Sequence, residues 1–168
     1  LEYVNWKNSF KALIEDKGLS ANEKMMYLEK YLGGRAYRAV ESYFYGKSES
    51  SYENAWNLLD KRFGDKFLLQ QAYREKLNSW PKLNDGNDLQ NYSDFLRSCK
   101  DAMTWIPSLT ILNDCQEIQK LMEKLPHHLQ IRWNRQATEN LEARGEYPVF
   151  ERFVKFVEFE AKVASNPM

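Results

Sequence analysis

The residues that could do chemistry in this chain are two histidines and two cysteines, and their spacing does not assemble a reactive site. His127 and His128 are neighbours, so on a helix their side chains would point about 100° apart and could not both bind one metal ion. A nucleophilic thiol would need Cys99 or Cys115 beside an imidazole, and both histidines are distant in sequence. We therefore expect no metal site, and we expect both cysteines on the apolar stripes of helices as small buried side chains, without a disulfide.

Carboxylates are numerous, but none is paired inside an apolar stretch, where its pKa could be raised for acid–base work. Asp85-Gly86-Asn87 differs from the Asp-Thr/Ser-Gly of aspartic proteases, because glycine at 86 has no hydroxyl to orient a carboxylate, and a turn is the plainer interpretation. No glycine-rich phosphate-binding loop and no Cys-Cys-His-Cys zinc knuckle occurs. The sequence thus predicts a protein that is not an enzyme and that uses no cofactor and no small-molecule substrate.

Charge and hydropathy limit the classes of binding partner that we expect for this protein. The 24 basic and 24 acidic residues are interspersed, so no strong field favours a polyanion or an anionic membrane. No apolar run approaches the roughly 20 residues that span a bilayer, and no signal peptide is visible, although the chain does not begin with Met and is compatible with an excised fragment. We expect a cytoplasmic protein with neither nucleic acid nor membrane as its direct partner.

The strongest structural signal is the stretch from Ser50 to Asp65. Its apolar residues fall at i, i+3, i+4, i+7 and i+11 and form one stripe along an α-helix: Tyr52, Ala55, Trp56, Leu59 and Phe63. Ser50 and Glu53 have the spacing of a capping box at its start. Gly64 follows the last stripe residue, where a left-handed residue ends many helices. The sequence therefore predicts an amphipathic helix whose stripe is part of a core.

Similar stripes, separated by glycines and prolines, predict eight further helices. They are expected at about 3–16, 21–32, 35–45 and 65–80 in the first half, and at 88–106, 114–125, 128–141 and 149–164 in the second. No β-alternating run appears, so the fold class is all-α. The stretch 81–87 concentrates turn-forming residues. It predicts a hinge between a lobe of five helices, residues 1–80, and a lobe of four, residues 88–168.

Four short motifs occur in a defined order along the first lobe. They are W-x3-F at Trp6 and Phe10, K-x-x-YL at Lys24, Tyr27 and Leu28, G-x-A at Gly34 to Ala36, and A-x-x-x-L-x-x-RFG at Ala55, Leu59 and Arg62 to Gly64. Their order and spacing, with the closing EAKVASNPM, resemble the Gag capsid region of retroelements, most closely that of BEL/Pao-type retrotransposons. The resemblance implies N-terminal and C-terminal capsid lobes. It is looser in the second lobe, where Gln90 lacks the following glycine of the retroviral Q-G-x-x-E signature.

The resemblance implies a structural protein that self-associates into oligomers or a virus-like shell packaging element RNA. Its main partner would be another copy of itself, through weak contacts repeated by symmetry in a cytoplasmic particle. RNA would be bound only indirectly, by a region outside this chain. The alternative is a domesticated Gag-derived module that docks or dimerises without building a shell.

Nine large side chains are expected to anchor the cores of the two lobes: Trp6, Phe10, Leu28, Trp56, Leu59, Phe63, Leu96, Met122 and Phe153. Aromatic residues away from the core stripes are the best pointers to contact surfaces, because Tyr and Phe are enriched at interfaces. The candidate self-association residues are Tyr43, Tyr45, Phe156 and Phe159. For Phe156 and Phe159 the alternative is that both seal the last helix against the one before it.

Overall fold

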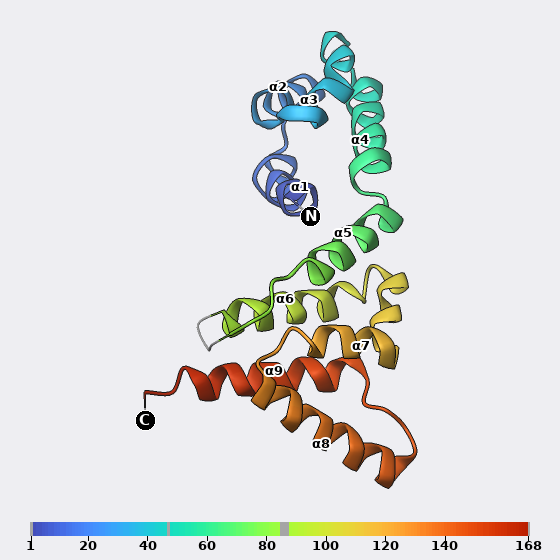
Figure 1. The fold of residues 1–168 in the computed structure, drawn as a ribbon. Helices are drawn as coiled ribbons and strands as arrows, with labels where there is room; N and C mark the ends of the chain where they lie inside the picture. Colours follow the sequence, from blue (N-terminus) through green and yellow to red (C-terminus); the bar gives the residue numbers. More distant parts are fainter. Residues whose placement is uncertain (1, 47, 85–87, 168) are drawn as a thin grey trace. The chain divides into compact units, whose positions relative to one another are not determined.

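The structure, a computed structural model, describes residues 2–46, 48–84 and 88–167 (Figure 1). Within these ranges the chain forms nine α-helices and three 3-10 helices and no strand, which confirms the predicted all-α fold. In the same ranges, no helix combines the length and the apolar composition needed to cross a bilayer.

The helices follow one another with short connections. The α-helices are α1 (Glu2–Ile14), α2 (Ala21–Tyr31), α3 (Gly34–Val40), α4 (Glu49–Phe63), α5 (Lys66–Asn78), α6 (Leu89–Ala102), α7 (Cys115–Met122), α8 (His127–Arg144) and α9 (Phe150–Ala164). The 3-10 helices are η1 (Glu15–Lys17), η2 (Glu41–Tyr45) and η3 (Pro107–Asn113). Each α-helix corresponds to one predicted helix, and the differences lie at the ends.

The chain divides into two compact units, Leu1–Ala72 and Tyr73–Met168, so the boundary falls inside α5. The sequence-based boundary lay later, at the expected hinge of 81–87, whose residues 85–87 lie outside the described residues. Residues 81–84 belong to the second unit, and Leu83 contributes its side chain to the core of that unit. Leu83 is buried, and its N–H donates to the carbonyl of Lys124 at 2.8 Å.

The core of the first unit is built on the stripe of α4. Tyr52, Ala55, Trp56 and Leu59 are buried, and Phe63 is partly buried at the end of the helix. The other helices contribute to the same cluster, from α1 Phe10, from α2 Met25 and Leu28, and from α3 Val40, with Trp6 partly buried against it. The stripe predicted from periodicity is therefore the stripe that the other helices cover.

In the second unit α6 and α9 lie side by side, and α8 packs against α9 (Figure 1). Leu96 of α6 and Phe153 of α9 are fully buried, and Met122 of α7 is buried as well. Trp133 of α8 is also fully buried, and its ring centroid lies 5.1 Å from that of Phe153. The Arg97 side chain joins α6 to two carboxylates of α9, Glu151 at 3.3 Å and Glu158 at 2.5 Å.

The ends of α4 differ from the prediction. Ser48, and not Ser50, is the N-cap, because its Oγ accepts a hydrogen bond from the N–H of Ser51 at 3.2 Å. Gly64 has φ −105°, so it is not left-handed. Its lack of a side chain instead allows Asp60 and Tyr3 to lie close to its backbone. A Cβ there would lie 3.0 Å from the carbonyl oxygen of Asp60 and 3.4 Å from a ring carbon of Tyr3.

Two long predicted helices are shorter because their last turns are not α-helical. The helix expected at 88–106 ends at Ala102, and turns lead to Pro107, consistent with the bias of the residue before a proline against helical backbone. The helix expected at 35–45 ends at Val40 and continues as the 3-10 helix η2. The 3-10 helix η2 is wound more tightly than the α-helix whose period was used to predict it.

Candidate functional site

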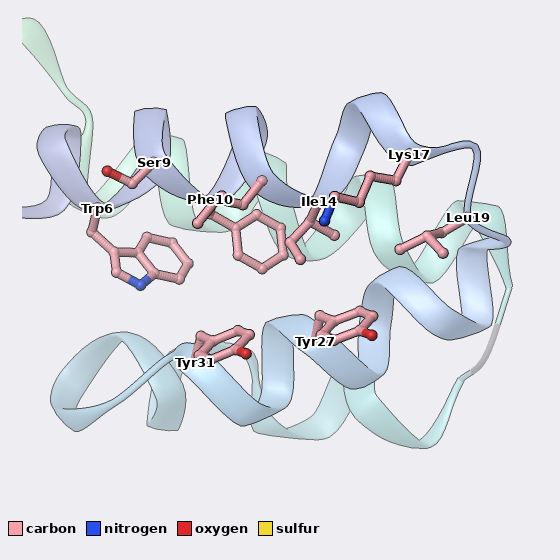
Figure 2. A pocket seen from close by; sticks show the side chains of 9 residues that line it. Trp6, Ser9, Phe10, Ile14, Lys17, Leu19, Tyr27 and Tyr31 are labelled. Atoms are coloured by element: carbon pink, nitrogen blue, oxygen red, sulfur yellow. The ribbon is translucent and has the colours of Figure 1, made fainter.

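An apolar groove of about 630 Å³ lies between α1 and α2 in the first unit (Figure 2). It is lined by Trp6, Ser9, Phe10, Leu13, Ile14, Lys17, Leu19, Tyr27 and Tyr31, and we call it the α1–α2 groove. Figure 2 shows side chains of α1 and η1 on one side and the two tyrosine rings of α2 on the other. Its volume lies within the range of about 300–1,000 Å³ typical of ligand pockets.

The α1 wall of the groove follows from helical spacing. Trp6, Phe10 and Ile14 are four residues apart and therefore lie along one face of α1. Phe10 and Ile14 are buried, so they belong to the core of the unit as well as to the groove. Trp6 stacks on Phe10 with ring centroids 5.4 Å apart. The base of the groove is therefore continuous with the core, which makes this wall rigid.

Three hydrogen bonds between side chains attach α1 and η1 to α4. The hydroxyl of Tyr3 donates to Asp60 Oδ1 at 2.9 Å, and Lys7 Nζ donates to the same oxygen at 2.7 Å. The hydroxyl of Tyr52 donates to Glu15 Oε1 at 3.0 Å. Burial and the hydrogen bond to Asp60 raise the pKa of Tyr3, so this hydroxyl remains a donor at neutral pH. These bonds orient the α1 wall of the groove.

The α2 wall consists of two stacked tyrosines. Tyr27 and Tyr31 are four residues apart, and their rings are nearly parallel, with centroids 6.2 Å apart and an angle of 4° between the planes. They lie next to the buried stripe of α2, which includes Met25 and Leu28. The ammonium group of Lys30 lies 5.4 Å from the centroid of the Tyr31 ring. The wall is therefore aromatic, with a positive charge at its edge.

The rim of the groove exposes much apolar surface. Leu13 is 62% exposed, Tyr31 52% and Tyr27 37%, and the neighbouring Met26 is 61% exposed. Single exposed apolar residues are common, but clusters around a concavity usually mark a site of association. The polar groups in its lining are few, namely the hydroxyls of Ser9 and the two tyrosines and the ammonium group of Lys17. The groove can bind an apolar side chain, because binding removes apolar surface of both partners from water.

The four predicted self-association residues lie outside the groove and in different environments. Tyr45 is 84% exposed and Phe159 is 64% exposed, whereas Tyr43 is partly buried against the core of the first unit. Phe156 is buried, with its ring centroid 5.4 Å from that of Trp133, which favours the alternative given for this residue. Phe156 thus seals α9 against α8, and Phe159 does not.

The sequence interpretation missed the groove residues Leu13, Tyr27 and Tyr31. Leu13 lies in the helix expected at about 3–16 and was given no role, and Tyr27 was named only as part of a motif. The signal that could have found them is the pair of tyrosines four residues apart, adjacent to the apolar stripe of Met25 and Leu28. Such a second stripe widens the apolar face beyond what one neighbouring helix can cover.

The cysteines and histidines have different environments. Cys99 is buried, and burial raises its pKa to about 12, so its thiol is neutral at physiological pH. The expectation of a buried side chain was wrong for Cys115, which is exposed because it is the first residue of α7 and precedes the buried Ile118. His127 and His128 are exposed at the start of α8. Among the described residues, no three metal-binding side chains gather.

A protein family described as "Protein of unknown function (DUF1759)" matches residues 1–142 of the chain. The match includes all of α1 to α7 and most of α8, and therefore every residue that lines the α1–α2 groove. No curated protein matches the chain, and no solved structure matches it.

Proposed function

The chain belongs to the DUF1759 family, and on this basis we propose that it is a structural capsid protein of the Gag type, most like those of BEL/Pao elements. It self-associates into oligomers or a virus-like shell that packages element RNA. The family is found in Gag/Pol-like proteins of retrotransposons, which supports the motif resemblance. In this proposal the chain performs no catalysis, the RNA is bound by a region outside it, and the particle is cytoplasmic.

The observation that carries the proposal is the apolar rim of the α1–α2 groove. Leu13, Tyr27 and Tyr31 surround a concavity of about 630 Å³ and remain exposed in the single chain. Aromatic residues are enriched in the buried centres of interfaces, where they supply a large contact area at small entropic cost. Covering this rim is therefore a source of free energy for association.

A second copy of the chain is the occupant that this proposal requires. The chain carries exposed aromatic side chains away from the groove, among them Tyr45, Phe67 and Phe159. A contact in which one of them enters the groove of another copy joins two different surfaces. Such heterologous contacts form rings or closed shells when their rotations close, as capsid assembly requires. Each contact can be weak, because symmetry repeats it many times.

The test compares two exposed aliphatic side chains of similar size. In sedimentation velocity, we expect the mass of the parent chain to increase with concentration, and we expect Leu13→Ser, in the groove, to reduce this increase. Ile131→Ser is the matched control, since Ile131 is 52% exposed on α8 and outside the groove. Both substitutions should change stability by no more than about 0.5 kcal/mol, as usual for exposed sites. Negative-stain microscopy of the parent chain should show particles.

The result against the proposal is a parent chain that stays monomeric at every concentration and forms no particles. One observation would then favour the docking alternative, since the groove runs between two helices and has the form that binds the apolar face of an amphipathic helix. A small soluble dimer without particles would also favour a docking or dimerisation module.

A further inference from the structure

The arginines of the first unit gather at one place on its surface. The unit contains three, Arg35, Arg38 and Arg62, and all three line one pocket of about 490 Å³ together with Ala39 and Phe63. Arg35 and Arg38 are three residues apart on α3 and therefore neighbours on its surface. Arg62 lies in the last turn of α4, which packs against α3. The packing of α3 on α4 thus brings together charges that are separate in the sequence.

The surroundings of these guanidinium groups differ from those of other arginines in the chain. Within the described residues, none of the three arginines forms an ion pair, and all three are exposed. In contrast, the second unit contains three arginines that each pair with at least one glutamate: Arg74, Arg97 and Arg132. Three like charges around one pocket repel one another, and an anion bound between them would offset this repulsion.

The chemistry of the cluster favours phosphate over a single carboxylate. A guanidinium group presents its donors in a planar fork that matches two oxygens of a phosphate, and such charge-assisted bonds are short and strong. Three forks around one pocket suit a ligand that carries several negative charges. Phe63 and Ala39, both partly buried, add apolar surface to the lining.

We propose that Arg35, Arg38 and Arg62 form a binding site for phosphate groups, supplied by the backbone of single-stranded RNA or by a free polyphosphate. This site shares no residue with the α1–α2 groove. It adds to the proposed function a contact with phosphate inside this chain, beside the RNA-binding region that the proposal places outside it. The equal totals of acidic and basic residues do not oppose it, because binding depends on local charge.

The experiment uses the full chain and two probes, a fluorescent single-stranded RNA of about ten nucleotides and inorganic tripolyphosphate, at about 0.05 M salt, where phosphate contacts are strongest. RNA binding is read by anisotropy and tripolyphosphate binding by calorimetry. The double variant Arg35→Gln/Arg62→Gln removes two of the charges. Its control, Arg135→Gln/Arg144→Gln, removes the same charge from α8, where both arginines are exposed and form no ion pair with any described residue.

We expect the parent chain to bind at least one probe and the Arg35→Gln/Arg62→Gln chain to bind it at least about tenfold more weakly, as the loss of two charge-assisted bonds predicts. The α8 control should stay within about twofold of the parent, and Arg38→Gln alone should weaken binding with an unchanged circular dichroism melt. Binding of RNA only identifies a nucleic-acid site, and binding of tripolyphosphate only identifies a site for a free anion. The proposal is overturned if neither probe binds, or if both double variants weaken binding equally.

Discussion

At the scale of single residues, Trp56 is the side chain on which the core of the first unit converges. Its ring centroid lies 5.9 Å from that of Trp6 and 5.6 Å from that of Phe10. The ammonium groups of Lys7 and Lys11 lie 5.6 and 5.4 Å from its centroid. Its buried Nε1 makes no hydrogen bond of normal geometry with any described residue, although it lies beside the Tyr52 hydroxyl. The packing of the ring therefore has to offset a donor that is not fully paired.

Two substitutions at Trp56 test how much the packing of its ring contributes to stability. Trp56→Ala should lower the free energy of unfolding by about 3–5 kcal/mol, the usual cost of deleting a large aromatic side chain from a core. Trp56→Phe should cost clearly less, because it keeps an aromatic ring and removes the N–H that is not fully paired. Urea denaturation followed by circular dichroism measures both. Equal losses for the two variants would contradict the role assigned to the aromatic ring, and no loss for Trp56→Ala would contradict the core role.

At the scale of elements, α9 shows why a wide apolar face need not be a contact surface. The helix packs against both α6 and α8, so its buried arc is broader than one neighbour would require. Phe156 is 4% exposed and lies inside this arc. Phe159, one turn later, lies outside it. Even Glu160 is buried on this helix, where Arg132 pairs with it at 2.8 Å.

The two phenylalanines of α9 give a matched pair of variants. Phe156→Ser should destabilise the second unit by at least about 3 kcal/mol, because it opens a cavity beside Trp133 and places a hydroxyl there. Phe159→Ser should change stability by no more than about 0.5 kcal/mol, as expected of an exposed site. Thermal melts of both variants provide the measurement. A stable Phe156→Ser chain would show that this ring is not needed in the core.

At the scale of the whole molecule, the boundary between the two units inside α5 determines which fragments of the chain we expect to fold. Tyr73 and Trp80 precede the expected hinge, yet both stack on Phe95 of α6, with ring centroids 5.9 and 5.5 Å away. Leu83, inside the expected hinge, is buried. The second unit therefore takes part of its core from residues that the sequence assigned to the first lobe or to the hinge.

Fragments with different starting points test this division. A fragment of residues 66–168 contains all of α5 and should melt cooperatively. A fragment of residues 88–168, which starts after the expected hinge, lacks Tyr73, Trp80 and Leu83 and should melt at least about 10 °C lower, since each kcal/mol shifts a small domain by several degrees. Differential scanning calorimetry measures both. Equal melting temperatures would contradict a boundary inside α5 and would favour the expected boundary at 81–87.

The sequence by itself determined the α-helices of the described part, their order and the stripe on α4, because helical periodicity is a local property that requires no knowledge of the neighbouring elements. It also identified Trp6 and Phe10, which form part of the α1–α2 groove. Only the tertiary structure decided which apolar faces stay uncovered, since periodicity shows which residues share a face but not how many elements pack against it. For the same reason Tyr27 is exposed, Phe156 is buried, and Arg62 meets two arginines of α3 that lie more than twenty residues before it.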